Sequence, residues 1–386
     1  MQYRQFGKLD WKVSALGFGA MRLPSTGTEM SSPVDETEAI RIMRYAIDHG
    51  VNYFDTAYMY HMGNSEKIVG RMLQDGYREK IRLATKMPVN MIQAAEEFER
   101  IFNEQLARLR TARIDFYLLH GINKASWHKV RDMGIIRWAE GKMASGKIDY
   151  LGFSFHDDYE AFKEIVDAYS GWTFCQIMYN YVDVNNQAGR RGVEYAAAKG
   201  LGIVVMEPLR GGMISKNPPE KVARIWVKTA QRRSWAEWGL QWVWNQPEIS
   251  VALSGMSNMQ QVQENIASAD RSRPGILTAD ELALIDRVRE AYKSLSPIPC
   301  TKCRYCAPCP NGVDIPGIFE IYNDVMVYDE PRLAFRYESP FGIKAEQRAD
   351  KCVECGNCIA ACPQKINVPE ELKKAHEKLK TKPKSP

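Results

Sequence analysis

Eight of the nine cysteines lie in two short runs near the C-terminal end of the chain. The first run is Cys300, Cys303, Cys306 and Cys309, and the second is Cys352, Cys355, Cys358 and Cys362. The second run has the C-x2-C-x2-C-x3-C-P spacing of thiolates that ligate 4Fe–4S clusters. Zinc is the alternative, since zinc sites also use C-x2-C pairs. Because both runs have four cysteines and end in Cys-Pro, the pattern favours two iron–sulfur clusters over zinc or disulfides.

The assignment of thiolates to the two clusters follows the same spacing rule. Three cysteines of a run bind one cluster, and the fourth typically reaches the other. We therefore expect one cluster on Cys300, Cys303, Cys306 and Cys362, and the other on Cys352, Cys355, Cys358 and Cys309. The first run is one residue shorter before its last cysteine, which leaves this exchange of ligands open.

A second group of reactive side chains lies far upstream. Asp55, Lys86 and His120 each end a predicted strand, and Tyr60 follows Asp55 by five residues. Strands in a sheet lie about 4.8 Å apart, so these side chains can meet if they point to the same side. A lysine next to a tyrosine is expected to lower the phenol's pKa, which would let the tyrosine donate and accept a proton. The carboxylate would keep the lysine charged, and a neutral imidazole would orient a substrate oxygen.

The elements that must position these residues alternate regularly. Eight apolar runs predict strands at 14–19, 51–55, 81–86, 114–120, 148–154, 173–179, 203–206 and 250–254, behind a short N-terminal hairpin. Helical periodicity lies between them, for example over 35–49, 96–109 and 161–169. This order predicts an α/β fold of the (β/α)8 TIM-barrel type. An open dinucleotide-binding sheet is disfavoured because residues 17–22 lack the third glycine of its fingerprint.

The strand-end residues and their neighbours resemble the aldo/keto reductase superfamily over about residues 1–293. The matching residues are Phe54-Asp55-Thr56-Ala57 with Tyr60, Asn64-Ser65-Glu66 with Gly70, Thr85-Lys86, and Asp115-Phe116-Tyr117-Leu118-Leu119-His120. The resemblance implies that Tyr60 donates the proton, Lys86 tunes it, Asp55 pairs with Lys86, and His120 positions a small-molecule carbonyl substrate. It also implies a hydride from NADP(H) or NAD(H).

The same resemblance implies a set of cofactor-binding residues. They are Ser154, Gln176, Leu209, Gly211 and Gly212, followed by Ser257, Gln261, Glu264 and Asn265. The match is incomplete: Phe155 replaces an asparagine, with His156 as a substitute, and Met206 replaces an aromatic residue. No lysine or arginine lies in residues 255–265 to hold a 2′-phosphate, so the choice between NADP and NAD is open.

The C-terminal part resembles the helical, two-cluster ferredoxin domains that are fused to a subset of aldo/keto reductases. Residues 300–316 carry this likeness, and a helix is expected to begin near Pro316. We expect a reductase-like barrel over 1–293, a linker over 294–299, a ferredoxin-like domain over 300–372, and a basic, disordered tail over 373–386.

Composition and charge limit the classes of partner and location. The 386 residues include 45% hydrophobic and 26% charged residues, which excludes low-complexity and wholly disordered chains. The net charge of +5 gives no argument for nucleic acid. The N-terminus lacks the apolar run of a secretory signal and no apolar stretch is long enough to cross a membrane, so a cytoplasmic protein is expected.

These observations leave two main functional hypotheses. The first is an oxidoreductase that interconverts a carbonyl and an alcohol while its clusters exchange electrons with a partner such as ferredoxin. Hydride transfer moves two electrons and each cluster one, and no flavin motif is present to mediate between them. The alternative is therefore a non-enzymatic electron carrier or redox-responsive module with structural or sensing clusters on an idle barrel.

Overall fold

The fold comes from a computed structural model that describes residues 1–27, 32–227, 232–300, 302, 305–339, 342–362 and 364–380. Two compact units are present: Met1–Lys216 with Gln231–Ala279, and Asn217–Ala230 with Asp280–Pro386. The second unit thus begins before the Ser/Pro segment that the sequence suggested as a linker.

The first unit is a closed barrel of eight parallel strands in the order β10-β3-β4-β5-β6-β7-β8-β9. The strands are β3 (Leu16–Gly19), β4 (Tyr53–Asp55), β5 (Arg82–Met87), β6 (Ile114–Ile122), β7 (Ile148–Phe155), β8 (Phe174–Met178), β9 (Gly202–Met206) and β10 (Val251–Ser254). Each overlaps one of the eight predicted runs, so the predicted TIM barrel is confirmed. The predicted hairpin is formed by β1 (Tyr3–Gln5) and β2 (Lys12–Ser14), which pair antiparallel.

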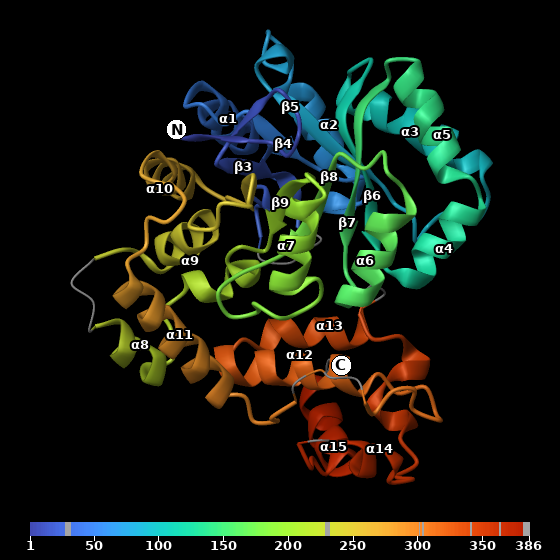
Figure 1. The fold of residues 1–386 in the computed structure, drawn as a ribbon, viewed down its shortest axis with the longest axis vertical. Helices are drawn as coiled ribbons and strands as arrows, with labels where there is room; N and C mark the ends of the chain where they lie inside the picture. Colours follow the sequence, from blue (N-terminus) through green and yellow to red (C-terminus); the bar gives the residue numbers. More distant parts are fainter. Residues whose placement is uncertain are drawn as a thin grey trace. The chain divides into compact units, whose positions relative to one another are not determined.

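Helices follow the strands and lie outside the barrel, as α3, α5 and α6 show in Figure 1. In this unit they are α1 (Glu36–Asp48), α2 (Ser65–Met72), α3 (Glu96–Leu109), α4 (Lys124–Asp132), α5 (Ile135–Ala144), α6 (Tyr159–Ala168), α7 (Gly189–Ala198), α9 (Trp235–Trp244) and α10 (Met259–Asp270). Side-chain caps fix several of their starts. Asp35 accepts a hydrogen bond from Glu38 N at α1, and Asp158 accepts one from Ala161 N at α6.

The barrel interior is closed at its N-terminal end by the hairpin. Phe6 is fully buried, and its ring centroid lies 4.9 Å from that of Phe116 and 5.8 Å from that of Phe174. The apolar layer includes Tyr53, Ala84, Phe116, Leu118, Phe174, Val204 and Val251. Because successive side chains of a strand alternate between its two faces, residues two positions after this layer also point inward. The interior beyond this layer therefore receives Asp55, Lys86, His120, Gln176 and Met206.

The second unit is helical and has its own apolar core. Its helices are α8 (Glu220–Trp226), α11 (Ala279–Ser294), α12 (Ile315–Tyr328), α13 (Phe335–Glu338), α14 (Asn357–Ala361) and α15 (Val368–Leu379). The core includes Ile318, Phe319, Tyr337, Leu372 and Ala375. Helix α12 begins at Ile315 with Pro316 in its first turn, close to the predicted start.

The C-terminal helix differs from the expected disordered tail. Residues 373–379 complete α15, because Ala375 and Leu379 are buried in the apolar core. His376 Nδ1 also lies 2.7 Å from the Tyr337 hydroxyl. The expected disorder is therefore wrong for these residues, whose charged side chains hid an amphipathic pattern; residues 381–386 lie outside the described part. Among the described helices, none has the length and apolar character needed to span a membrane.

Candidate functional site

The four predicted catalytic residues meet at the C-terminal ends of β4, β5 and β6. Asp55 is paired in register with Ala84, two residues before Lys86, and Lys86 is paired with Leu118, two residues before His120. On each successive strand, the side chain therefore lies two residues closer to the C-terminal end of the barrel. Tyr60 begins the short helical turn η2 (Tyr60–Gly63) that follows β4.

Lys86 is the centre of this group. Its ammonium is fully buried and donates hydrogen bonds to Asp55 Oδ1 at 2.5 Å and to the carbonyl of Thr56 at 2.8 Å. The Lys86 Nζ also lies 3.4 Å from the Tyr60 hydroxyl. The ring of His120 stands nearly perpendicular to that of Tyr60, with centroids 5.8 Å apart. An amine, a phenol, a carboxylate and an imidazole thus lie together, with Asp55 and Lys86 buried and Tyr60 and His120 half-buried.

The Tyr60 phenol keeps its proton in this environment. Burial raises the pKa of Tyr60, Lys86 offsets part of this rise, and Asp55 and Glu207 add to it. The sequence predicted a lowered pKa because a nearby ammonium favours the phenolate. That prediction was wrong, since desolvation is the larger effect here. The result is a neutral phenol at physiological pH, which is the form that donates a proton.

The environment also determines the protonation states of Lys86 and His120, the two basic groups next to the phenol. Burial works against the Lys86 ammonium, but Asp55 and Tyr60 outweigh it, so the pKa of Lys86 lies above its ordinary value. Burial, followed by the charges of Lys86 and His156, brings the pKa of His120 well below its ordinary value. The site therefore presents a charged amine beside a neutral phenol and a neutral imidazole.

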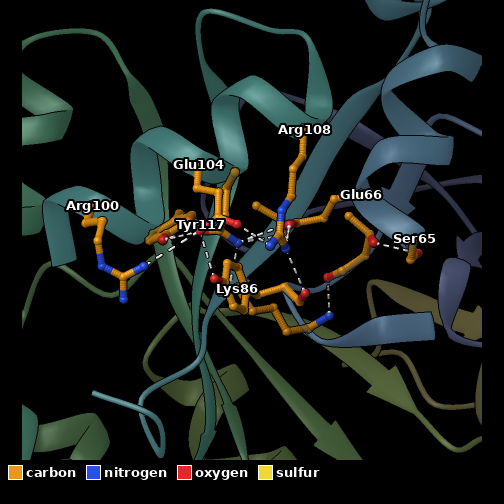
Figure 2. Close-up of polar contacts among 11 residues, drawn as sticks. Ser65, Glu66, Lys86, Arg100, Glu104, Arg108 and Tyr117 are labelled. Atoms are coloured by element: carbon orange, nitrogen blue, oxygen red, sulfur yellow. Dashed lines mark hydrogen bonds and ion pairs between the residues drawn. The ribbon is translucent and has the colours of Figure 1, made fainter. Parts of the chain in front are cut away.

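A buried polar network outside the barrel supports β5, the strand that carries Lys86. Figure 2 shows Glu66 of α2 and Arg108 of α3 converging beside Lys86 and Tyr117. The Glu66 carboxylate accepts hydrogen bonds from Thr85 Oγ1 and Gln105 Nε2, both at 2.7 Å, and it pairs with Arg108 at 3.3 Å. Gln105 also donates to the Lys86 carbonyl at 3.0 Å.

This network continues into the loop that carries Tyr60. Arg108 donates a hydrogen bond to the Tyr58 carbonyl at 3.1 Å, and its guanidinium lies 4.2 Å from the Tyr58 ring centroid. The network thus ties β5 to the residues just before Tyr60. No role was predicted for Glu66 or Gln105 from the sequence. The only signal was a polar residue at a core-facing position of each amphipathic helix.

Two of the predicted cofactor positions, Ser154 and Gln176, lie on neighbouring strands and are paired in register. The Gln176 Oε1 atom is buried and has no hydrogen-bond partner among the described residues, and its Nε2 has only the sulfur of Met206 at 3.7 Å. The Ser154 hydroxyl accepts a hydrogen bond from Gly121 N at 2.7 Å, which leaves its proton to donate. A carboxamide, such as that of nicotinamide, has the donors and the acceptor that would satisfy both side chains.

The other predicted cofactor positions lie in the segment after β9, in the loop after β10 and in helix α10. Leu209 precedes the turn η4 (Arg210–Ser215), where Gly211 and Gly212 adopt positive φ angles of 63° and 91°. At the start of α10, Ser257 N donates to Gln261 Oε1 at 2.8 Å.

The two remaining positions, Glu264 and Asn265, are adjacent in α10 but point to different environments. Glu264 is exposed, whereas Asn265 is buried and donates to Ser254 Oγ at 3.1 Å. The structure thus gives Asn265 a role in holding the end of β10.

Five of the eight clustered cysteines line one cavity of about 180 Å³ in the second unit. They are Cys306, Cys309, Cys352, Cys355 and Cys358. Burial raises the pKa of the Cys358 thiol, and Cys352, Cys355 and Cys309 add to the rise, so these four sulfurs lie near one another. They are also the four that the spacing assigned to one cluster. A cavity lined by soft sulfur donors suits an iron–sulfur cluster.

The remaining predicted ligands are only partly described. Cys300 and Cys362 are partly buried and pack against the apolar core of the second unit. Cys303 lies outside the described residues. Among the residues that are described, no three histidine, cysteine, aspartate or glutamate side chains are arranged to hold a single metal ion.

Comparison with known protein families gives two matches along the chain. Residues 15–290 match the aldo/keto reductase family, and residues 299–367 match a 4Fe–4S dicluster domain. The first match spans well over half of the chain and includes Asp55, Tyr60, Lys86 and His120.

Individual relatives agree with the first match. L-galactose dehydrogenase of Arabidopsis thaliana is 28% identical over 314 residues, which are 77% of this chain and 97% of the relative. Methylglyoxal reductase YeaE of Escherichia coli (strain K12) is 27% identical and covers 74% of this chain and 94% of its own length. The solved aldo-keto reductase AKR11C1 from Bacillus halodurans (holo form) has a TM-score of 0.61 and 27% identity, covering 75% of this chain and 96% of its own. The chain is therefore an oxidoreductase of the aldo/keto reductase family that carries a C-terminal 4Fe–4S dicluster domain.

Proposed function

We propose that this protein interconverts a small carbonyl compound and the corresponding alcohol with NADP(H) or NAD(H). The observation that carries the proposal is the buried Lys86 ammonium, bound to Asp55 and 3.4 Å from the Tyr60 hydroxyl. When bound, the nicotinamide supplies the hydride that adds to the carbonyl carbon. Tyr60 donates its proton to the carbonyl oxygen, so the hydride and the proton that the reduction requires are both accounted for.

The remaining residues support this proton transfer. Lys86 stabilises the phenolate that Tyr60 leaves, because its positive charge lies beside the phenol oxygen. Asp55 keeps the ammonium charged in a buried place. His120 is neutral, so it offers a ring N–H to the carbonyl oxygen without adding a positive charge to the site.

The nucleotide would use the positions described above. Gln176 and Ser154 have unused hydrogen-bonding capacity that fits the carboxamide of nicotinamide. Leu209, Gly211, Gly212, Ser257, Gln261 and Glu264 would border the rest of the molecule. The names of two relatives, a galactose dehydrogenase and a methylglyoxal reductase, support small sugars and dicarbonyls as the first substrates to test.

The protonation states predict a broad pH profile for reduction. Tyr60 titrates above its ordinary pKa and His120 well below its own. The active form, with a protonated phenol and a neutral imidazole, therefore persists between these limits. We expect kcat/KM for aldehyde reduction to stay level from about pH 6.5 to about pH 9 and to fall only at higher pH. A single fall centred near pH 7 would contradict these assignments.

We further propose that residues 300–372 hold two 4Fe–4S clusters that exchange electrons with a redox protein such as ferredoxin. Bound clusters supply one-electron transfer, and the cysteine thiolates hold and shield them. Cys309 raises the pKa of the Cys358 thiol together with Cys352 and Cys355, which supports its assignment to the cluster of the second run.

Removing two thiolates of one proposed cluster tests that assignment. Cys309→Ala and Cys352→Ala should each remove the same cluster and leave about half of the iron and sulfide. The double variant should lose no more than either single variant, as measured by iron and sulfide content and by EPR of the reduced protein. Loss of both clusters in the double variant, with one lost in each single variant, would show that Cys309 binds the other cluster.

The proposed activity is tested with anaerobically purified protein. NADPH and NADH are each titrated against the cluster absorbance, and turnover of methylglyoxal and small sugars is followed at the nicotinamide absorbance. Turnover supports the reductase, and bleaching of the clusters supports electron exchange between them and the nucleotide. Intact clusters with neither nucleotide binding nor turnover would favour the alternative, a redox-responsive module on an idle barrel.

A further inference from the structure

Arg22 lies at a junction of three loops at the barrel mouth. It ends the short turn η1 (Ala20–Arg22), which follows β3 directly. Strand β10 lies between β3 and β9 in the barrel. The segments after these three strands are therefore neighbours, although they are far apart in the sequence.

The Arg22 side chain extends from the segment after β3, past the segment after β10, to the segment after β9. A Cβ atom added to Gly255, after β10, would lie 3.2 Å from the Cβ and the Cδ of Arg22. A Cβ atom added to Gly211, after β9, would lie 3.3 Å from Nη2 of Arg22. The aliphatic stem thus lies along one glycine, and the guanidinium ends beside the other.

The backbone at Arg22 is held in this place. The Ser257 hydroxyl donates a hydrogen bond to the Arg22 carbonyl at 2.9 Å. The next amide, of Leu23, donates to Nε2 of His61 at 3.2 Å. Both contacts connect the turn after β3 to other segments of the mouth, so the direction of the arginine is set by the fold.

The charge of Arg22 is available to a ligand. Arg22 is exposed, and it makes no ion pair with any residue that the structure describes. The neighbouring Arg210 is different, because it is paired with Asp183 at 2.7 Å. Arg22 therefore brings a positive charge, which no described carboxylate pairs with, to the two segments that were assigned to the nucleotide from the sequence.

We propose that Arg22 binds the diphosphate of the nicotinamide dinucleotide, an inference that rests on the proposed function. The carboxamide end fits Gln176 on β8. The resemblance to the aldo/keto reductases implies that the adenosine end lies against Ser257, Gln261 and Glu264, around the start of α10. The diphosphate joins these ends and must pass the loop of Gly211, where the guanidinium lies. A planar guanidinium matches phosphate oxygens with paired N–H donors. NADP and NAD share the diphosphate, so Arg22 serves both.

The test measures nucleotide affinity in the cluster-containing protein under anaerobic conditions. NADPH, NADH and ADP-ribose are titrated against tryptophan fluorescence in wild type, Arg22→Gln and Arg22→Lys. We expect Arg22→Gln to weaken all three ligands by about 10- to 100-fold, the contribution of one or two charged hydrogen bonds. Arg22→Lys keeps the charge and should recover part of the loss. Higher salt should weaken binding less in Arg22→Gln than in wild type.

Arg41→Gln is the matched control, because it removes the same charge from an exposed position of α1 that is paired with Glu38. It should leave the affinities unchanged. Wild-type binding of both nucleotides with equally tight binding by Arg22→Gln would overturn this inference alone. A loss confined to NADPH would also overturn it, since it would assign Arg22 to the 2′-phosphate. Absence of binding by wild type would overturn the proposed function as well.

Discussion

Replacement of Tyr60 by phenylalanine is expected to lower the rate of carbonyl reduction by about 10²- to 10⁴-fold. The reason is chemical: we propose that the phenol transfers its proton to the carbonyl oxygen, whereas His120 only donates a hydrogen bond to it. Phenylalanine keeps the ring but lacks the proton. Nucleotide affinity and cluster content should stay near those of wild type. The measurement is steady-state kcat with a small aldehyde, together with nucleotide titration by fluorescence.

Tyr58→Phe is the control for this substitution. Tyr58 lies in the same loop and loses a comparable hydroxyl, but that hydroxyl bonds to Glu104 at 2.8 Å on the outside of the barrel. We expect Tyr58→Phe to retain most of the activity. Equal activity of Tyr60→Phe and wild type would remove Tyr60 from the reaction.

Replacement of Lys86 by methionine is expected to affect both stability and activity. Methionine has a similar length, but it leaves the buried Asp55 carboxylate without its partner. Removing one member of a buried ion pair costs about 3–5 kcal/mol of folding free energy. The phenolate of Tyr60 also loses its stabilising charge, so reduction should fall by about 10²-fold or more. Urea unfolding followed by tryptophan fluorescence measures the first effect, and kcat measures the second.

A double variant separates these two effects. In Lys86→Met with Asp55→Asn, the unpaired carboxylate is replaced by a neutral amide, so most of the lost stability should return. Activity should remain low, because the ammonium beside Tyr60 is still missing. Recovery of activity together with stability would mean that Lys86 acts on the fold and not on the proton transfer.

The barrel was predictable because its strands are short apolar runs separated by amphipathic helices. The closed order of the strands also explains why Asp55, Lys86 and His120 meet: each lies at or near the C-terminal end of one of three consecutive strands. The pKa of Tyr60 was not predictable in the same way. It depends on the balance between desolvation and the distance to Lys86, and a sequence contains neither quantity.

The other differences also have physical reasons. Glu66 and Gln105 bond to each other across two helices and to β5, so their roles appear only when α2, α3 and β5 are packed together. Arg22 faces Gly211 because β3 and β9 flank β10, a neighbourhood that arises from closure of the barrel. In α15, half of the residues are lysine or glutamate, and burial of Ala375 and Leu379 shows the apolar face that these charged residues obscure.

Transfer of a labelled hydride tests the central claim most directly. The protein is incubated anaerobically with NADPH or NADH that carries two deuterium atoms at C4 of the nicotinamide, and with a panel of small aldehydes and dicarbonyls that includes methylglyoxal. We predict an alcohol product with one deuterium on the former carbonyl carbon, formed by wild type and hardly at all by Tyr60→Phe. An unlabelled alcohol, or nucleotide oxidation that reduces the clusters without forming any alcohol, would contradict direct hydride transfer at this barrel mouth.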